Sequence, residues 1–171
     1  MRKIIIVMLV CLLLGESSAQ DSLAIRNFTR IDKQVCAAGQ PTMEQFARLK
    51  AEGIKAVINL RHTSEPFVAE EEAKAKEMGL RYFSIPVAYY SPKEEQADEF
   101  LKIMDDAQNR PVFVHCAAAI RVSAFWMIRR VLRDGWAVEK AEEEARQIGL
   151  HPQAEHLRKF ALDYIERHKK K

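Results

Sequence analysis

A short apolar run that ends abruptly at His115-Cys116 constrains this chain more than any other segment. The run reads Pro-Val-Phe-Val, which is typical of a central strand buried on both faces of a parallel sheet. A loop of small residues follows, and Arg121 then opens a long apolar helix, Val122 to Leu132. We therefore predict a strand, a tight loop and a helix N-terminus, an arrangement whose backbone amides and helix dipole converge on a bound anion.

Three side chains in this segment are candidates for a direct part in catalysis. Cys116 stands at the start of the loop, where amides and a helix dipole favour the thiolate, so it is a candidate nucleophile. Arg121 ends the loop and offers a planar fork of donors to an oxyanion. His115 is placed to hold the loop and tune the thiolate. Together they predict attack on a tetrahedral anion, and a phosphate ester is the leading candidate.

The segment resembles the cysteine-dependent phosphatases of the dual-specificity and tyrosine type, whose signature is a strand ending in His-Cys, a phosphate loop, an Arg and then Ser or Thr. It resembles most closely the bacterial beta-lactamase-hydrolase-like phosphatase group and its exported relatives. Four motifs carry this resemblance in the same order: Ala38-Gly39-Gln40-Pro41, Val57 to Arg61, Ile85-Pro86-Val87, and the Cys116 loop running into Arg121 to Phe125.

The resemblance implies a phosphocysteine mechanism. Cys116, Arg121 and His115 are then the catalytic residues, and the substrate phosphoryl group is bound by the loop, whose members are Ala117, Ala118, Ala119 and Ile120. It also implies that Ser123 hydrogen-bonds the sulfur of Cys116. The alternative for Ser123 is a backbone hydrogen bond near the start of the helix.

A second strand is predicted from Lys55 to Leu60, and the polar loop after it, residues 61–66, contributes further candidates. In parallel sheets ligands gather at the carboxyl ends of the strands, which places His62 and Glu65 near Cys116 as substrate-binding or acid groups. A surface loop with no role is the alternative. Asn59 and Arg61 are expected to support the strand end rather than to contact substrate.

Three departures from the phosphatase pattern keep other functions open. Four residues separate Cys116 from Arg121 where most such phosphatases have five, which shortens the loop by about 3.5 Å. The mid-loop glycine is also missing, and alanine resists positive φ. No carboxylate follows the Ile-Pro-Val motif in residues 88–91, although a leaving alkoxide needs a proton. A rhodanese-like sulfurtransferase or persulfide carrier, a non-catalytic anion- or partner-binding module, and a merely structural buried cysteine remain alternatives.

The first nineteen residues read as a secretory signal peptide. Arg2-Lys3 precedes an apolar run from Ile4 to Leu14, and small residues at Ser17 and Ala19 suit cleavage after Ala19. The run is shorter than the roughly 20 residues of a membrane anchor, so we expect no stable anchor after cleavage. We predict a periplasmic or secreted protein whose residues 20–171 form a single phosphatase-like domain.

The remaining composition adds few constraints. The formal charge is only +3. Acidic runs such as Glu70-Glu71-Glu72 alternate along the chain with basic pairs such as Arg129-Arg130, as is typical of solvated helix faces. Nucleic acid is therefore not an expected partner. We expect no metal or other cofactor, and a phosphorylated protein or a small-molecule phosphate as partner. Cys36 and Cys116 could form a disulfide in an oxidising compartment, which would block the nucleophile.

Strands and helices alternate along the chain. The pattern predicts a three-layer α/β fold, similar to that of cysteine phosphatases, with a short, mainly parallel sheet of four to five strands flanked by helices. Capping boxes are expected to begin helices after Thr42 and after Ser91. The function predicted overall is hydrolysis of phosphomonoesters by an exported phosphatase of the protein-tyrosine or dual-specificity type.

Overall fold

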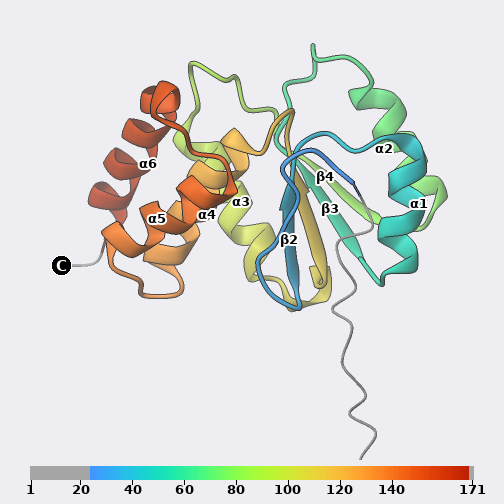
Figure 1. Ribbon diagram of the computed structural model, residues 1–171, viewed down its shortest axis with the longest axis horizontal. Helices are drawn as coiled ribbons and strands as arrows, with labels where there is room; N and C mark the ends of the chain where they lie inside the picture. Colours follow the sequence, from blue (N-terminus) through green and yellow to red (C-terminus); the bar gives the residue numbers. More distant parts are fainter. Residues whose placement is uncertain (1–23, 170–171) are drawn as a thin grey trace, which may run out of the picture.

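The computed structural model describes residues 24–169 (Figure 1). The predicted signal peptide and its cleavage site lie outside these residues, so both stay predictions. Within residues 24–169 no helix is both long enough and apolar enough to span a lipid bilayer.

In the described residues, five strands form one sheet in the order β1-β2-β5-β3-β4. Their bounds are β1 Thr29–Arg30, β2 Val35–Ala38, β3 Ala56–Asn59, β4 Arg81–Ser84 and β5 Val112–His115. β1 pairs antiparallel with β2, and the other pairings are parallel. Ala38 and Asn59 both lie level with His115, so three strands end together at one edge of the sheet. This confirms the predicted mainly parallel sheet.

Helices cover both faces of the sheet, as the three-layer prediction requires (Figure 1). On one face lie α1 (Met43–Ala51) and α2 (Val68–Glu77), and on the other lie α3 (Glu94–Asp105), α4 (Ile120–Leu132), α5 (Val138–Ile148) and α6 (Glu155–His168). Short 3₁₀ turns, η1 (Ala107–Asn109) and η2 (Pro152–Ala154), precede β5 and α6.

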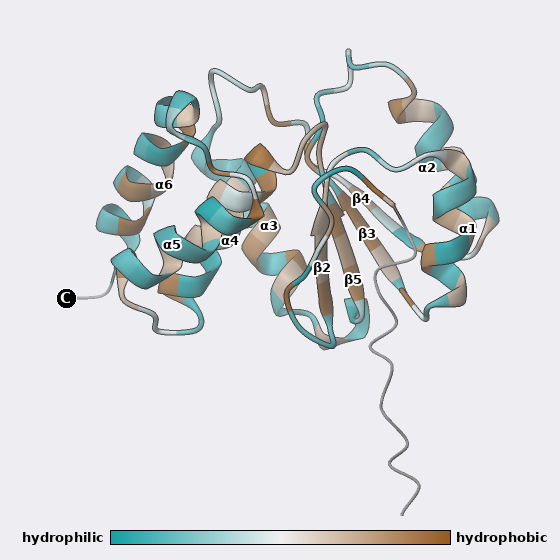
Figure 2. Ribbon diagram, viewed as in Figure 1, coloured by the Kyte–Doolittle hydropathy of each residue, from teal (hydrophilic) through white to brown (hydrophobic). Residues whose placement is uncertain are grey.

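The core has two parts, one on each side of the sheet. Phe46 and Leu49 of α1 pack on one face, whereas Phe100 of α3 and Phe125 of α4 meet edge to face on the other. α4 packs between the sheet and helices α5 and α6, which explains why its sequence is apolar around most of its circumference. Figure 2 shows the strands in hydrophobic colours and the outer helices α5 and α6 largely in hydrophilic ones.

The two predicted capping boxes have different outcomes. The first is confirmed, because the Gln45 amide donates to Thr42 Oγ1 at 3.3 Å and the Thr42 amide donates to Gln45 Oε1 at 2.7 Å. The second is wrong, since α3 begins at Glu94 and the Lys93 amide donates to Gln96 Oε1 at 2.8 Å. Gln96 Nε2 also donates to the Pro86 carbonyl at 2.7 Å, which fixes the helix start against the chain leaving β4.

Candidate active site

Cys116 lies directly after the central strand β5, at the edge where the parallel strands end. Its side chain is buried, and its amide donates to the Ala38 carbonyl at 3.4 Å. Cys36 is level with Phe113 and belongs to the core under α1 and α2, whereas Cys116 belongs to the core under α3 and α4. The two do not form a disulfide with each other, so the competing prediction of a blocked nucleophile is not realised.

The loop after Cys116 leads straight into the N-terminus of α4. Ala119 has φ 65°, the left-handed conformation that alanine was expected to resist, at a cost of about 1 kcal/mol. In the described part of the chain, the amides of Ala117, Ala118, Ile120 and Arg121 donate to no other residue. First-turn amides have no partner inside a helix and carry its positive dipole end, so they are available to an anion.

The outer side of the loop is held by two segments far away in the sequence. The Ala117 carbonyl accepts from the Gln40 amide at 3.3 Å, and the Ala118 carbonyl accepts from Asn27 Nδ2 at 3.0 Å. Gly39 approaches so closely that a Cβ there would lie 2.9 Å from the Arg26 carbonyl oxygen and 3.0 Å from that of Ala117. The Ala-Gly-Gln-Pro motif therefore supports the loop from outside, and glycine is required by space.

Arg121 is fixed by acceptors on one side of its guanidinium. Nη1 donates to Glu65 Oε1 at 2.5 Å and to the Val87 carbonyl at 3.0 Å, and Nη2 donates to Glu65 Oε2 at 2.9 Å. This leaves Nε–H and one hydrogen of Nη2, which together form a second fork. Burial opposes the charge, yet the hydrogen bond to Glu65 and the charge of Cys116 outweigh it and raise the pKa of Arg121 above its ordinary value.

Glu65 lies at the site as predicted, but its carboxylate already accepts hydrogen bonds from several neighbouring groups. Besides Arg121, it accepts from Arg61 Nε at 3.3 Å and from the His62 amide at 2.7 Å. Burial raises its pKa, but the hydrogen bond from Arg121 and the other donors dominate and lower the pKa of Glu65 from 4.5 to about 2. Glu65 is ionised at neutral pH, which argues against an acid role. The His62 ring faces its own loop, with Nδ1 2.8 Å from Ser64 Oγ.

His115 is anchored by a buried carboxylate that was predicted to face solvent. Its Nε2 lies 2.8 Å from Oε1 of Glu71 on α2, and both side chains are fully buried. Asn59 Nδ2 at 3.0 Å and Tyr82 OH at 2.7 Å donate to the same oxygen, and Gln40 Nε2 donates to the other. The expectation that Glu71 sits on a solvated helix face is wrong, because α2 turns Glu71 toward the sheet.

This network also accounts for the support residues. Arg61 donates to Gln40 Oε1 at 2.6 Å and to the Pro66 carbonyl at 2.7 Å, while its amide donates to Asn59 Oδ1 at 2.8 Å. Asn59 and Arg61 thus stabilise the strand end, as predicted. Burial raises the pKa of Glu71. The charge of His115 and the hydrogen bonds that the Glu71 carboxylate accepts lower it by more, so the pKa of Glu71 lies below its ordinary value.

Two further residues complete the surroundings of Cys116. Ser123 Oγ donates to the Ile120 carbonyl at 2.7 Å, so the backbone alternative is the one observed. Tyr89, which the sequence reasoning did not single out, interacts electrostatically with Cys116 and Arg121. Burial and Tyr90 raise its pKa, so its phenol stays protonated at neutral pH. Its position two residues after the Ile-Pro-Val motif was the available signal.

Comparisons with known proteins show which family the chain belongs to. The family model described as "DSP-PTPase phosphatase fused to NAD+ Kinase" matches residues 16–160. The chain belongs to this family. It is a member of the cysteine phosphatase superfamily, which confirms the resemblance drawn from the four sequence motifs.

Two known proteins are similar to part of this chain. A beta-lactamase hydrolase-like protein of Agrobacterium fabrum is 32% identical over 107 residues, 60% of this chain and 25% of that protein. The inositol diphosphatase DSP4 of Arabidopsis thaliana is 28% identical over 93 residues, 53% of this chain and 47% of that protein. This chain therefore spans about a quarter of the first relative and about half of the second.

A solved structure of a putative phosphatase (DUF442) from Shewanella putrefaciens has a similar fold. It is 26% identical in sequence, has a TM-score of 0.70, and the match covers 85% of this chain and 95% of that chain. The family's fold therefore accounts for almost all of the described residues.

Proposed function

We propose that this protein hydrolyses phosphomonoesters through a phosphocysteine intermediate. The observation that carries the proposal is the position of Arg121, which Glu65 and the Val87 carbonyl hold beside Cys116 with one fork of donors that neither of these acceptors takes. An oxyanion bound by that fork and by the free loop amides places its phosphorus within reach of the sulfur.

The reaction divides into two displacements. The Cys116 thiolate attacks phosphorus, an S–P bond forms, and the P–O bond to the leaving group breaks. Water then attacks the same phosphorus, the S–P bond breaks, and phosphate leaves as the thiolate is regenerated. Arg121 and the loop amides stabilise the equatorial oxygens in both steps, because negative charge builds up on these oxygens in the transition state.

We further propose a preference for phenolic phosphate esters, including phosphotyrosine. Residues 88–91 contain no carboxylate, and Glu65 is ionised at neutral pH, so neither supplies a proton to the leaving oxygen. A phenolate is a weak base and leaves without full protonation, whereas an alkoxide does not. The expected order of kcat/KM is therefore aryl phosphate above alkyl phosphate.

Turnover of p-nitrophenyl phosphate by the full chain and by Cys116→Ser tests the mechanism. We expect phosphate release that vanadate inhibits and that Cys116→Ser reduces to background, with a phosphorylated cysteine trapped by rapid acid quench. Thiosulfate-to-cyanide sulfur transfer without phosphate release would instead support the sulfurtransferase alternative, which the four-residue loop keeps open. Inactivity in both assays would identify a binding module.

We also propose that the protein is exported, on the basis of the apolar run from Ile4 to Leu14 and the small residues before Ala19. Expression of the full chain in a Gram-negative host, followed by fractionation and N-terminal sequencing, tests this. Recovery of a chain beginning at Gln20 outside the cytoplasm is expected, and an unprocessed cytoplasmic chain would contradict it.

A further inference from the structure

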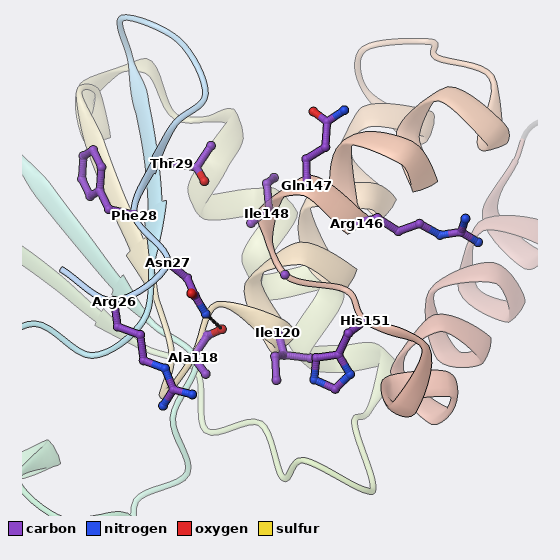
Figure 3. A pocket seen from close by; sticks show the side chains of 11 residues that line it. Arg26, Asn27, Phe28, Thr29, Ala118, Ile120, Arg146, Gln147, Ile148 and His151 are labelled. Carbon is purple, nitrogen blue, oxygen red and sulfur yellow. Dashed lines mark hydrogen bonds between the residues drawn. The ribbon is translucent and has the colours of Figure 1, made fainter. Parts of the chain in front are cut away.

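A cavity of about 400 Å³ borders the outer side of the Cys116 loop (Figure 3). One wall is the N-terminal arm, residues 24–30, and the opposite wall is the end of α5 with the turn that follows it. Ala118 and Ile120 of the loop lie between the two walls. The cavity is therefore continuous with the loop that is proposed to hold the reacting phosphoryl group.

The charged side chains that line this cavity are all basic. Arg26 and Arg146 line it together with His151, and none of its lining residues in the described chain is acidic. Arg146 already donates to the carboxylate of Glu142, which also accepts from Arg158. In residues 24–169, neither the Arg26 nor the His151 side chain has a hydrogen-bond or ion-pair partner. Figure 3 shows Arg26 and His151 extending on the side where Ala118 and Ile120 lie.

Arg26 is fixed in place through its backbone. Its carbonyl accepts from the Gly39 amide at 2.7 Å, and the next residue, Asn27, donates from Nδ2 to the Ala118 carbonyl. The arm and the loop thus move as one unit. An arginine held in this way loses less freedom on binding an anion than one on a mobile segment.

The charges beside Cys116 are nearly balanced without these residues. Arg61 and Arg121 share the carboxylate of Glu65, and the remaining positive charge is balanced by the Cys116 thiolate. A phosphoryl dianion therefore already exceeds the positive charge beside the sulfur. A substrate with a second phosphate therefore needs further donors, and the cavity provides the Arg26 guanidinium and a ring N–H of His151.

We infer that this cavity is a second anion subsite, in which Arg26 and His151 bind the second phosphate of a small substrate that carries at least two phosphoryl groups. The inference rests on the proposed function for the identity of the first subsite. The reacting phosphoryl group sits over Cys116, and the second group lies across Ala118 toward the arm. Single-phosphate esters use the first subsite alone.

Binding to the inactive full chain Cys116→Ser tests the inference without relying on turnover. Calorimetric titration with methylenediphosphonate and propylenediphosphonate is compared with titration by inorganic phosphate. We expect at least one diphosphonate to bind about 10-fold more tightly than phosphate. Added Arg26→Gln or His151→Asn is expected to remove most of that advantage and to change phosphate binding less than about twofold.

Arg48→Gln is the matched control, since Arg48 is an exposed cation on α1 outside the cavity. It should leave the diphosphonate advantage intact. Equal affinities for phosphate and both diphosphonates, or the same loss in Arg48→Gln as in Arg26→Gln, would overturn the inference. Arg26-dependent diphosphonate binding without any phosphatase turnover would refute the proposed hydrolysis and leave the subsite standing.

Discussion

At the scale of single residues, the pairing of Glu65 with Arg121 decides how the site is organised. A guanidinium on a flexible stem has many rotamers, and only some of them direct its donors at Cys116. Glu65 takes the two donors at the tip, and the Val87 carbonyl takes a third. The carboxylate thus selects the rotamer that leaves the second fork free for the substrate, and Glu65 is a positioning residue.

Replacement of this carboxylate should impair the site more than it impairs the fold. In Glu65→Gln we expect kcat/KM for p-nitrophenyl phosphate to fall about 10- to 100-fold, because Arg121 loses its orientation. The inhibition constant for vanadate should rise in parallel. Glu70→Gln, which removes a charge from the exposed side of α2, is the control. An unchanged vanadate constant in Glu65→Gln would show that Arg121 keeps its orientation without the carboxylate.

Replacement of Glu71 should affect the stability of the fold, because Glu71 is buried with His115. In Glu71→Gln the buried acceptor for His115, Tyr82 and Asn59 is weakened, and we expect a loss of about 3 kcal/mol in the free energy of unfolding. Glu72→Gln breaks an exposed pair with Lys76 and should cost less than about 0.5 kcal/mol. Urea unfolding at pH 7 measures both variants.

Acid titration of stability separates the two carboxylates from the rest of the protein. The folded-state pKa values of Glu65 and Glu71 lie below 4.5, so each carboxylate stabilises the fold above that pH. This stability is lost as the pH falls below 4.5, for Glu65 down to about 2. The wild-type urea midpoint should therefore fall steeply below pH 4.5, and less steeply in Glu65→Gln or Glu71→Gln. Parallel curves would contradict the assignment.

At the scale of elements, the turn at Gly39 and the Cys116 loop behave as one structural unit. A methyl group at residue 39 would meet carbonyl oxygens of Arg26 and Ala117 at or below 3.0 Å, so one of these segments must move. Gly39→Ala should cost about 2 kcal/mol and weaken phosphate binding. Gly53→Ala is the control: its φ of 86° makes it similarly strained, yet it has open space around it and lies outside the site. Equal phosphate affinities in both variants would contradict the coupling.

The sequence predicts the elements better than their side-chain partners. The four parallel strands are predicted because apolar, β-branched runs between turns are a local signal, and α4 because its apolar pattern has no polar face. The two-residue strand β1 lies in a segment predicted to be an arm, because so short a strand has no pattern of its own. The Cys116–Arg121 constellation was found because its residues lie within one short segment. The predicted start of α3 failed because Gln96 also binds the Pro86 carbonyl, a tertiary contact that no local pattern shows.

Glu71 shows why a buried acid is missed. Three consecutive glutamates read as a solvated face, yet Val68, Glu71 and Ala75 share the buried side of α2 at helical spacing. The helical spacing of these residues therefore indicated that Glu71 is buried, but the acidic composition of the segment favoured a solvated face. The role of Glu65 was unpredictable for another reason, since its partner Arg121 lies 56 residues away in the sequence.

At the scale of the whole molecule, the sheet separates the two cysteines. Cys36 lies level with Phe113, three residues before Cys116, which amounts to roughly 10 Å along the strand direction. A disulfide needs Cα atoms within about 7 Å, so the folded protein should not form this bridge. We expect no Cys36–Cys116 cross-linked peptide after incubation with oxidised glutathione in buffer. Its appearance without urea would contradict the separation.

The contact between Asn27 and Ala118 spans 91 residues of sequence. Two stretches that are far apart in the gene therefore pack against each other. A substitution in one stretch is accepted only if it still fits the residues of the other. Chimeras that exchange the arm alone between homologues should lose function more often than chimeras that carry arm, turn and loop across together. Epistasis in a mutational library of this protein is expected to concentrate on that junction.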